Sequence, residues 1–105
     1  MGDRHVFEDS QDERGSRRYA DAYLDGDGRL VLSIHDLGPV VEDFFGCFEY
    51  ESFTTFSVEQ TARLRTDLGE DLIAAIGERF ASQRELAEYA AALVGSGEHW
   101  SRAGD

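Results

Sequence analysis

The sequence predicts an α+β domain: a small, mainly antiparallel three-stranded sheet with helices packed on one face. Two runs of alternating apolar and polar residues flank an Asp-Gly turn at residues 25–28, which is typical of a hairpin. In the C-terminal half, two capping boxes precede apolar stripes with helical spacing. The predicted element order is therefore ββαβααα. A chain of 105 residues is sized for one domain.

The first two strands are predicted at residues 18–24 and 30–35, joined by the Asp-Gly turn. Asp-Gly tolerates the positive φ that tight hairpin turns require. Pro39 suits the first position of a short third element, a helix that Gly46 can end.

A third strand is predicted at residues 47–56, because this segment is rich in aromatic residues and Thr. Its alternation places Phe48, Tyr50, Thr54 and Phe56 on one face and Glu49, Glu51 and Phe53 on the other. Three helices follow, and Ser57 and Ser82 are the expected N-caps of the first and the last. The predicted helices span residues 58–68, about 70–80, and the segment from Ser82 to Gly95.

The two ends of the chain are predicted to lie outside the regular structure. Residues 1–17 are polar, with Val6 and Phe7 as their large apolar side chains, so we expect a flexible tail before a domain at 18–105. A short arm pinned only by Val6 and Phe7 is the alternative. The segment after Gly95 is expected to be a loop from which Trp100 folds back onto the body.

The charge of the chain limits its partners. It has 22 acidic and 10 basic residues, a formal net charge of −12. This charge disfavours binding to nucleic acid and to anionic membrane surfaces, and it favours a basic protein partner. The single cysteine, Cys47, fits a reducing compartment, and no apolar run suits a signal peptide or a membrane span. We therefore expect a cytoplasmic protein.

No motif indicates catalysis, a metal or a cofactor. Cys47 and His35 lack the sharp nucleophile turn and the glycine-rich oxyanion site that a nucleophilic enzyme would show. The three histidines, His5, His35 and His99, lie far apart in the sequence. A calcium loop starting at Asp25 would need an oxygen ligand where Arg29 stands. We therefore predict no catalytic residues, no metal and no cofactor, and favour a binding protein over an enzyme.

An acidic stretch suggests where a partner binds. No Arg occurs between Leu30 and Ala62, although this stretch contains six acidic residues. Acidic groups around an exposed aromatic residue suit a partner rich in Arg or Lys. A solvated acidic face without a partner is the alternative. The predicted partner-binding residues are Glu42, Asp43, Glu49, Glu51 and Phe53.

A small-molecule site between the sheet and the helices is the rival hypothesis. Such pockets are mostly aromatic with a few convergent polar groups. The candidate lining residues are Tyr19, Tyr23, His35, Tyr50 and Tyr89. Tyrosines that merely pack in the core with their hydroxyls at the surface are the alternative. A homo-oligomer formed through the third strand is a further hypothesis.

The segment from Asp36 to Gly46, DLGPVVEDFFG, followed by Glu49-Tyr50-Glu51, resembles a group of small uncharacterised proteins of actinobacteria and other bacteria. These share a D-L-G-P, F-F/W-G, Y-E-Y pattern, from which this chain departs at Phe48, where Tyr is expected. The resemblance implies the α+β fold and a cytoplasmic bacterial setting, and it brings no established activity. The functional hypothesis is a small acidic protein that occludes or regulates a basic partner, such as an immunity-type inhibitor.

Overall fold

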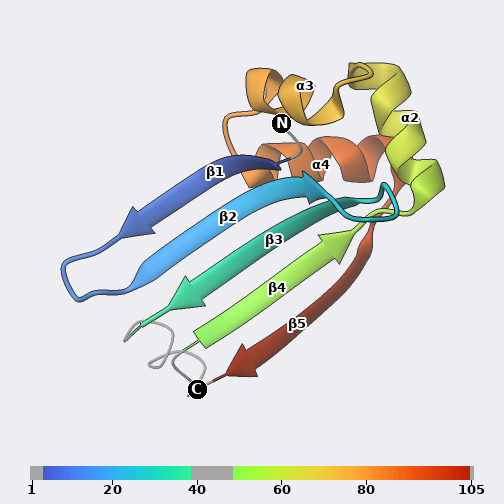
Figure 1. The fold of residues 1–105 in the computed structure, drawn as a ribbon. Coiled ribbons are helices and arrows are strands. Elements are labelled where there is room, and N and C mark those ends of the chain that lie inside the picture. Colours follow the sequence, from blue (N-terminus) through green and yellow to red (C-terminus); the bar gives the residue numbers. More distant parts are fainter. Residues whose placement is uncertain (1–3, 39–48, 105) are drawn as a thin grey trace.

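The computed structural model describes residues 4–38 and 49–104, and it confirms the α+β class. The helix expected after Pro39 lies outside the described residues. Figure 1 shows one sheet with helices gathered near one end of its strands. The elements are β1 (Arg4–Gln11), β2 (Arg17–Leu24), β3 (Leu30–Leu37), β4 (Glu49–Thr55), α2 (Val58–Leu68), α3 (Leu72–Arg79), α4 (Gln83–Val94) and β5 (Glu98–Gly104).

The sheet has five strands in the order β1-β2-β3-β4-β5, and every neighbouring pair is antiparallel. The prediction of three strands was wrong, because the two edge strands come from the segments expected to be a tail and a loop. β1 is held by backbone pairing to β2 and by cross-strand ion pairs. Asp9 accepts from Arg17 at 2.9 Å, and Glu8 lies 3.6 Å from Arg18. Phe7 packs against the core as well, so backbone pairing, one apolar side chain and these half-exposed ion pairs together hold the strand.

The hairpin between β2 and β3 forms as predicted. Asp25 organises the turn, because its Oδ1 accepts from the backbone N–H groups of Asp27 and Arg29, both at 2.9 Å. Gly28 takes the positive φ of 79° that a side chain would disfavour. The chain then continues directly into β3, so residues 25–29 form the hairpin turn between β2 and β3.

Local caps fix where the helices start. Ser57 and Gln60 exchange reciprocal side-chain to backbone hydrogen bonds at the start of α2, which confirms the first capping box. The hydroxyl of Ser82 accepts from the backbone N–H of Glu85 at the start of α4. At α3, the carboxylate of Asp71 serves as the cap. None of the described helices is long and apolar enough to cross a membrane.

The core lies between the helices and one face of the sheet, as predicted. Ala22 of β2 and Leu32 of β3 are register partners and pack with the helices. The largest completely buried apolar side chains are Leu30, Leu64, Leu72, Ile76 and Leu86. The sheet contributes Ala22, Leu30, Leu32 and Phe56 to this core, and they lie toward the end of β2, at the start of β3 and just after β4. In the other direction the strands continue past the helices (Figure 1).

Candidate functional site

The candidate site lies on the face of the sheet opposite the helices, called here the open face. Successive side chains of a strand point to opposite faces. Ala22, Leu32 and Thr54 form a row on the helix side, because Ala22 and Leu32 belong to the core. The adjacent row, which includes Phe53 and Trp100, therefore points the other way. The β4 residues on the open face are Glu49, Glu51, Phe53 and Thr55, and the first three were placed on one face by the alternation of the sequence.

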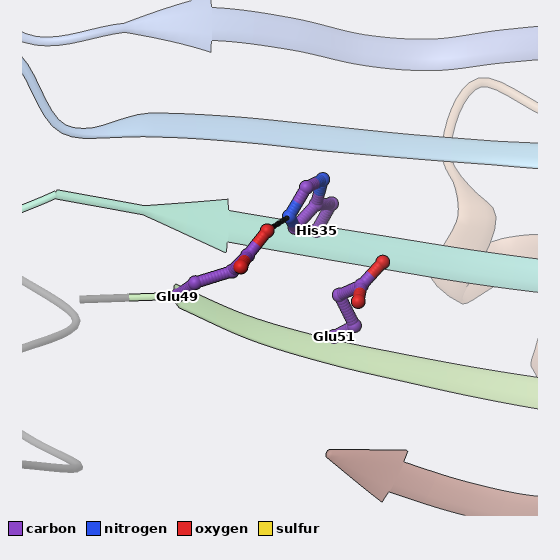
Figure 2. A group of neighbouring side chains, drawn as sticks. All are labelled: His35, Glu49 and Glu51. Atoms are coloured by element: carbon purple, nitrogen blue, oxygen red, sulfur yellow. Dashed lines mark hydrogen bonds and ion pairs between the residues drawn. The ribbon is translucent and has the colours of Figure 1, made fainter. Parts of the chain in front are cut away.

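Three chemically active side chains meet on the open face, near the end of β3 and the start of β4 (Figure 2). His35 of β3 is the register partner of Glu51 in β4, and Glu49 lies two residues further along β4. The Nε2 atom of His35 lies 2.6 Å from Oε2 of Glu49. One donor atom from each of the three residues lies within 4.8 Å of the other two. The strand register thus assembles one imidazole and two carboxylates.

β5 adds a cation to this group. The Nε–H of Arg102 donates to Oε1 of Glu51 at 2.6 Å, and the two residues are register partners. This hydrogen bond, together with the negative charge of Glu51, raises the pKa of Arg102 further above its usual value. Arg102 therefore remains a permanent positive charge beside the two carboxylates.

A buried carboxylate lies further along the open face. Asp21 is fully buried, and its Oδ2 accepts from Nη1 of Arg4 at 2.8 Å. The hydroxyl of Ser33 also donates to Asp21. The guanidinium of Arg4 lies 4.5 Å above the ring centre of Tyr23, in cation–π geometry. Burial raises the pKa of the Tyr23 hydroxyl and the Asp21 carboxylate raises it further, so this hydroxyl stays protonated at neutral pH.

A pocket of about 210 Å³ opens between these two groups. Its lining includes Arg4, Tyr19, Tyr23, His35, Glu51 and Phe53. Three residues of the predicted small-molecule pocket, Tyr19, Tyr23 and His35, are therefore brought together. They meet on the open face, whereas the sequence placed the pocket between the sheet and the helices.

The other two predicted pocket residues lie elsewhere. Tyr50 belongs to the alternate set of β4 residues and points to the helix side of the sheet. Tyr89 of α4 packs against Phe80, with ring centres 5.2 Å apart. Two predicted partner-binding residues, Glu42 and Asp43, lie outside the described residues.

Several site residues were missed by sequence reasoning because they come from the edge strands or from buried positions. Arg4 lies in the segment expected to be a tail, and Arg102 lies in the expected C-terminal loop. Asp21 belongs to a predicted strand, but nothing in its spacing shows that it is buried. The alternation of Trp100 and Arg102 was the available signal for an edge strand, and the glycines around it obscured that signal.

The described residues do not form a nucleophilic triad. His35 and Glu49 resemble a base with an orienting carboxylate, and Ser33 is on the same face. However, the hydroxyl of Ser33 donates its hydrogen bond to Asp21. His35 therefore does not accept that proton, and it does not activate Ser33 as a nucleophile. The arrangement is better suited to binding a cation, through carboxylates and aromatic faces.

The sequence matches no known protein-family model, and comparison with curated proteins and with solved structures finds no significant similarity.

Proposed function

We propose that this chain is a small binding protein whose open face engages a basic segment of a protein partner. The observation that supports this most directly is the joint presence of Glu49, Glu51, Phe53 and Trp100 on the open face. An immunity-type inhibitor of a cationic enzyme is one protein of this kind.

The composition of the face suits a protein contact. Trp, Tyr and Arg dominate binding energy at protein interfaces, and this face presents Trp100, Tyr19 and Arg102. Trp100 is 48% exposed. A carboxylate offers about four acceptor positions, so Glu51 can bind an incoming guanidinium while it keeps Arg102.

The charge of the whole chain supports fast capture of such a partner. A formal net charge of −12 attracts a cationic protein from a distance. Electrostatic steering of this kind raises association rates to as much as about 10⁸–10⁹ M⁻¹s⁻¹ at low salt. Binding should therefore weaken as the salt concentration rises.

The pocket is better matched to one side chain than to a whole ligand. Its volume of about 210 Å³ is below the roughly 300–1,000 Å³ typical of small-molecule sites. A Lys or Arg of the partner would lie beside Tyr19 and Phe53, close to the carboxylate of Glu51, because Arg4 already covers the ring of Tyr23. A small-molecule site remains the second candidate, because Tyr19, Tyr23 and His35 converge on this pocket.

A matched pair of variants tests the proposal. Glu49→Gln/Glu51→Gln removes two charges from the open face, whereas Glu70→Gln/Glu78→Gln removes two from exposed positions in the helical half. Both variants have the same net charge, so a partner captured by wild type at low salt and eluted by salt should be kept by the second variant and lost by the first. Equal capture by the two variants would show that only net charge matters and would contradict a site on the open face.

A further inference from the structure

The cluster of His35, Glu49 and Glu51 has the ligand types of a metal site. Each residue supplies a nitrogen or oxygen donor, and the three donor atoms lie within 4.8 Å of one another. We propose that these three residues bind a divalent transition-metal ion of the Zn²⁺ type, with water completing its coordination. This site shares Glu49 and Glu51 with the proposed partner contact, but binding of the ion needs no second protein.

The geometry requires only small side-chain movements. Zn²⁺ binds His nitrogen at about 2.0–2.1 Å and carboxylate oxygen at about 2.0–2.2 Å, so donors around a tetrahedral ion lie about 3.4 Å apart. Nε2 of His35 and Oε2 of Glu49 are now 2.6 Å apart and would separate slightly. Glu51 would move inward. The paired strands hold the three backbones in fixed register, so side-chain rotation alone completes the site.

The nitrogen atom that faces the carboxylates is the one a metal would use. Nε2 of His35 points toward Glu49, as Figure 2 shows. An imidazole ligand favours Zn²⁺ and related ions over Mg²⁺ and Ca²⁺, which prefer oxygen ligands. The mixed donor set therefore predicts selectivity for Zn²⁺ over Mg²⁺.

A neighbouring side chain already orients one ligand. Arg102 donates to Oε1 of Glu51, which allows the second oxygen of that carboxylate to reach the ion. Hydrogen bonds of this kind to ligating carboxylates orient them and commonly change metal affinity by about 10–100-fold. The side chains of His35 and Glu49 are 35% and 37% exposed, so water can reach the open coordination position.

Without a metal, the same residues are held by the His35–Glu49 hydrogen bond and the Glu51–Arg102 ion pair. Titration calorimetry of the chelator-treated protein with Zn²⁺ distinguishes a metal site from a cluster that forms these two interactions alone. We expect one equivalent of Zn²⁺ to bind and to raise the melting temperature, and Mg²⁺ at the same concentration to do neither. Co²⁺ substitution should give visible absorption bands that report the coordination geometry.

Variants assign the binding to these residues. His35→Gln and Glu51→Gln should each weaken Zn²⁺ binding by at least about tenfold, since even orienting residues have effects of about 10–100-fold. Arg102→Gln should weaken it less than either. His99→Gln is the control, because His99 lies on the same sheet but bonds to Thr54 on the helix side. Far-UV circular dichroism checks that each variant is folded.

Three results would overturn the proposal: no Zn²⁺ binding by wild type, unchanged binding by a folded His35→Gln variant, or loss of binding in His99→Gln alone. The first result would mean that the cluster forms only ordinary ion pairs. Either of the other two would mean that Zn²⁺ binds at other residues. Partner capture measured in the presence of a chelator does not depend on Zn²⁺ binding. This measurement therefore tests the partner proposal separately from the metal proposal.

Discussion

The indole of Trp100 stacks on the ring of Phe53, with ring centres 4.5 Å apart and planes inclined by 18°. The two residues are register partners on β4 and β5. This stack joins the edge strand to the sheet and also displays a half-exposed indole on the open face. It therefore contributes to stability and, by our proposal, to binding.

Removing the indole should affect binding more than folding. We expect Trp100→Ala to lower the free energy of unfolding by the about 0.5–1.5 kcal/mol of the aromatic pair, plus the contribution of the buried half of the indole. Partner capture should be lost, because hot-spot tryptophans dominate interface energy. The comparison is Phe56→Ala, which empties a core position that is 2% exposed and should cost about 3–5 kcal/mol. Urea unfolding measures both, and a larger cost for Trp100→Ala than for Phe56→Ala would contradict this division.

The Glu51–Arg102 pair predicts a charge-swap result. Glu51→Lys places two positive charges directly opposite each other across β4 and β5, so it should destabilise the fold and lower the melting temperature. Adding Arg102→Glu restores opposite charges and should recover most of that loss. The double variant should still fail to bind Zn²⁺, because a ligand has gone. Thermal melts of the two single variants and the double variant test the coupling, and purely additive effects would count against it.

The Arg4–Asp21 pair should contribute more to the free energy of unfolding than the other cross-strand ion pairs of β1. Arg4→Ala leaves the fully buried Asp21 carboxylate with Ser33 as a donor, and an unsatisfied buried acceptor costs about 1–3 kcal/mol. Arg17→Ala is the matched control, because its pair with Asp9 is about half exposed at both ends and should be worth under about 1 kcal/mol. Similar losses for the two variants in urea unfolding would show that Asp21 does not depend on Arg4.

The hairpin turn gives a pH-dependent prediction. Hydrogen bonds to Asp25 from the backbone N–H groups of Arg29 and Asp27, with the nearby Arg29 guanidinium, lower the pKa of its carboxyl group. A pKa that is lower in the folded state stabilises the fold above the unfolded pKa of about 3.9, and this contribution disappears as the pH falls through the folded value. Asp25→Ala should therefore melt below wild type at pH 7.

The difference in melting temperature between wild type and Asp25→Ala should shrink as the pH is lowered from about 5 toward 3. Asp27→Ala serves as the control, because that side chain is 76% exposed and should change little at any pH. A gap that widens in acid would mean that the sign of the Asp25 shift is wrong.

The sequence determined the parts of this fold that short-range chemistry decides. Asp25 and Gly28 make the hairpin turn, and Ser57 and Ser82 cap their helices with their own hydroxyls. The alternation of β4 likewise separated Glu49 from Tyr50 before any pairing was known. In each case the interacting groups are a few residues apart, so the local sequence contains both partners.

The tertiary structure decided which strands form the edges of the sheet and which side chains meet on the open face. β1 and β5 carry few apolar residues, and their stability comes from partners that are distant in the chain, such as Asp21 for Arg4 and Glu51 for Arg102. The cluster of His35 with Glu49 and Glu51 likewise depends on the β3–β4 register across a segment of more than ten residues. A sequence specifies these contacts only through the whole fold, because backbone pairing between strands sets their register and the register sets the distances between their side chains.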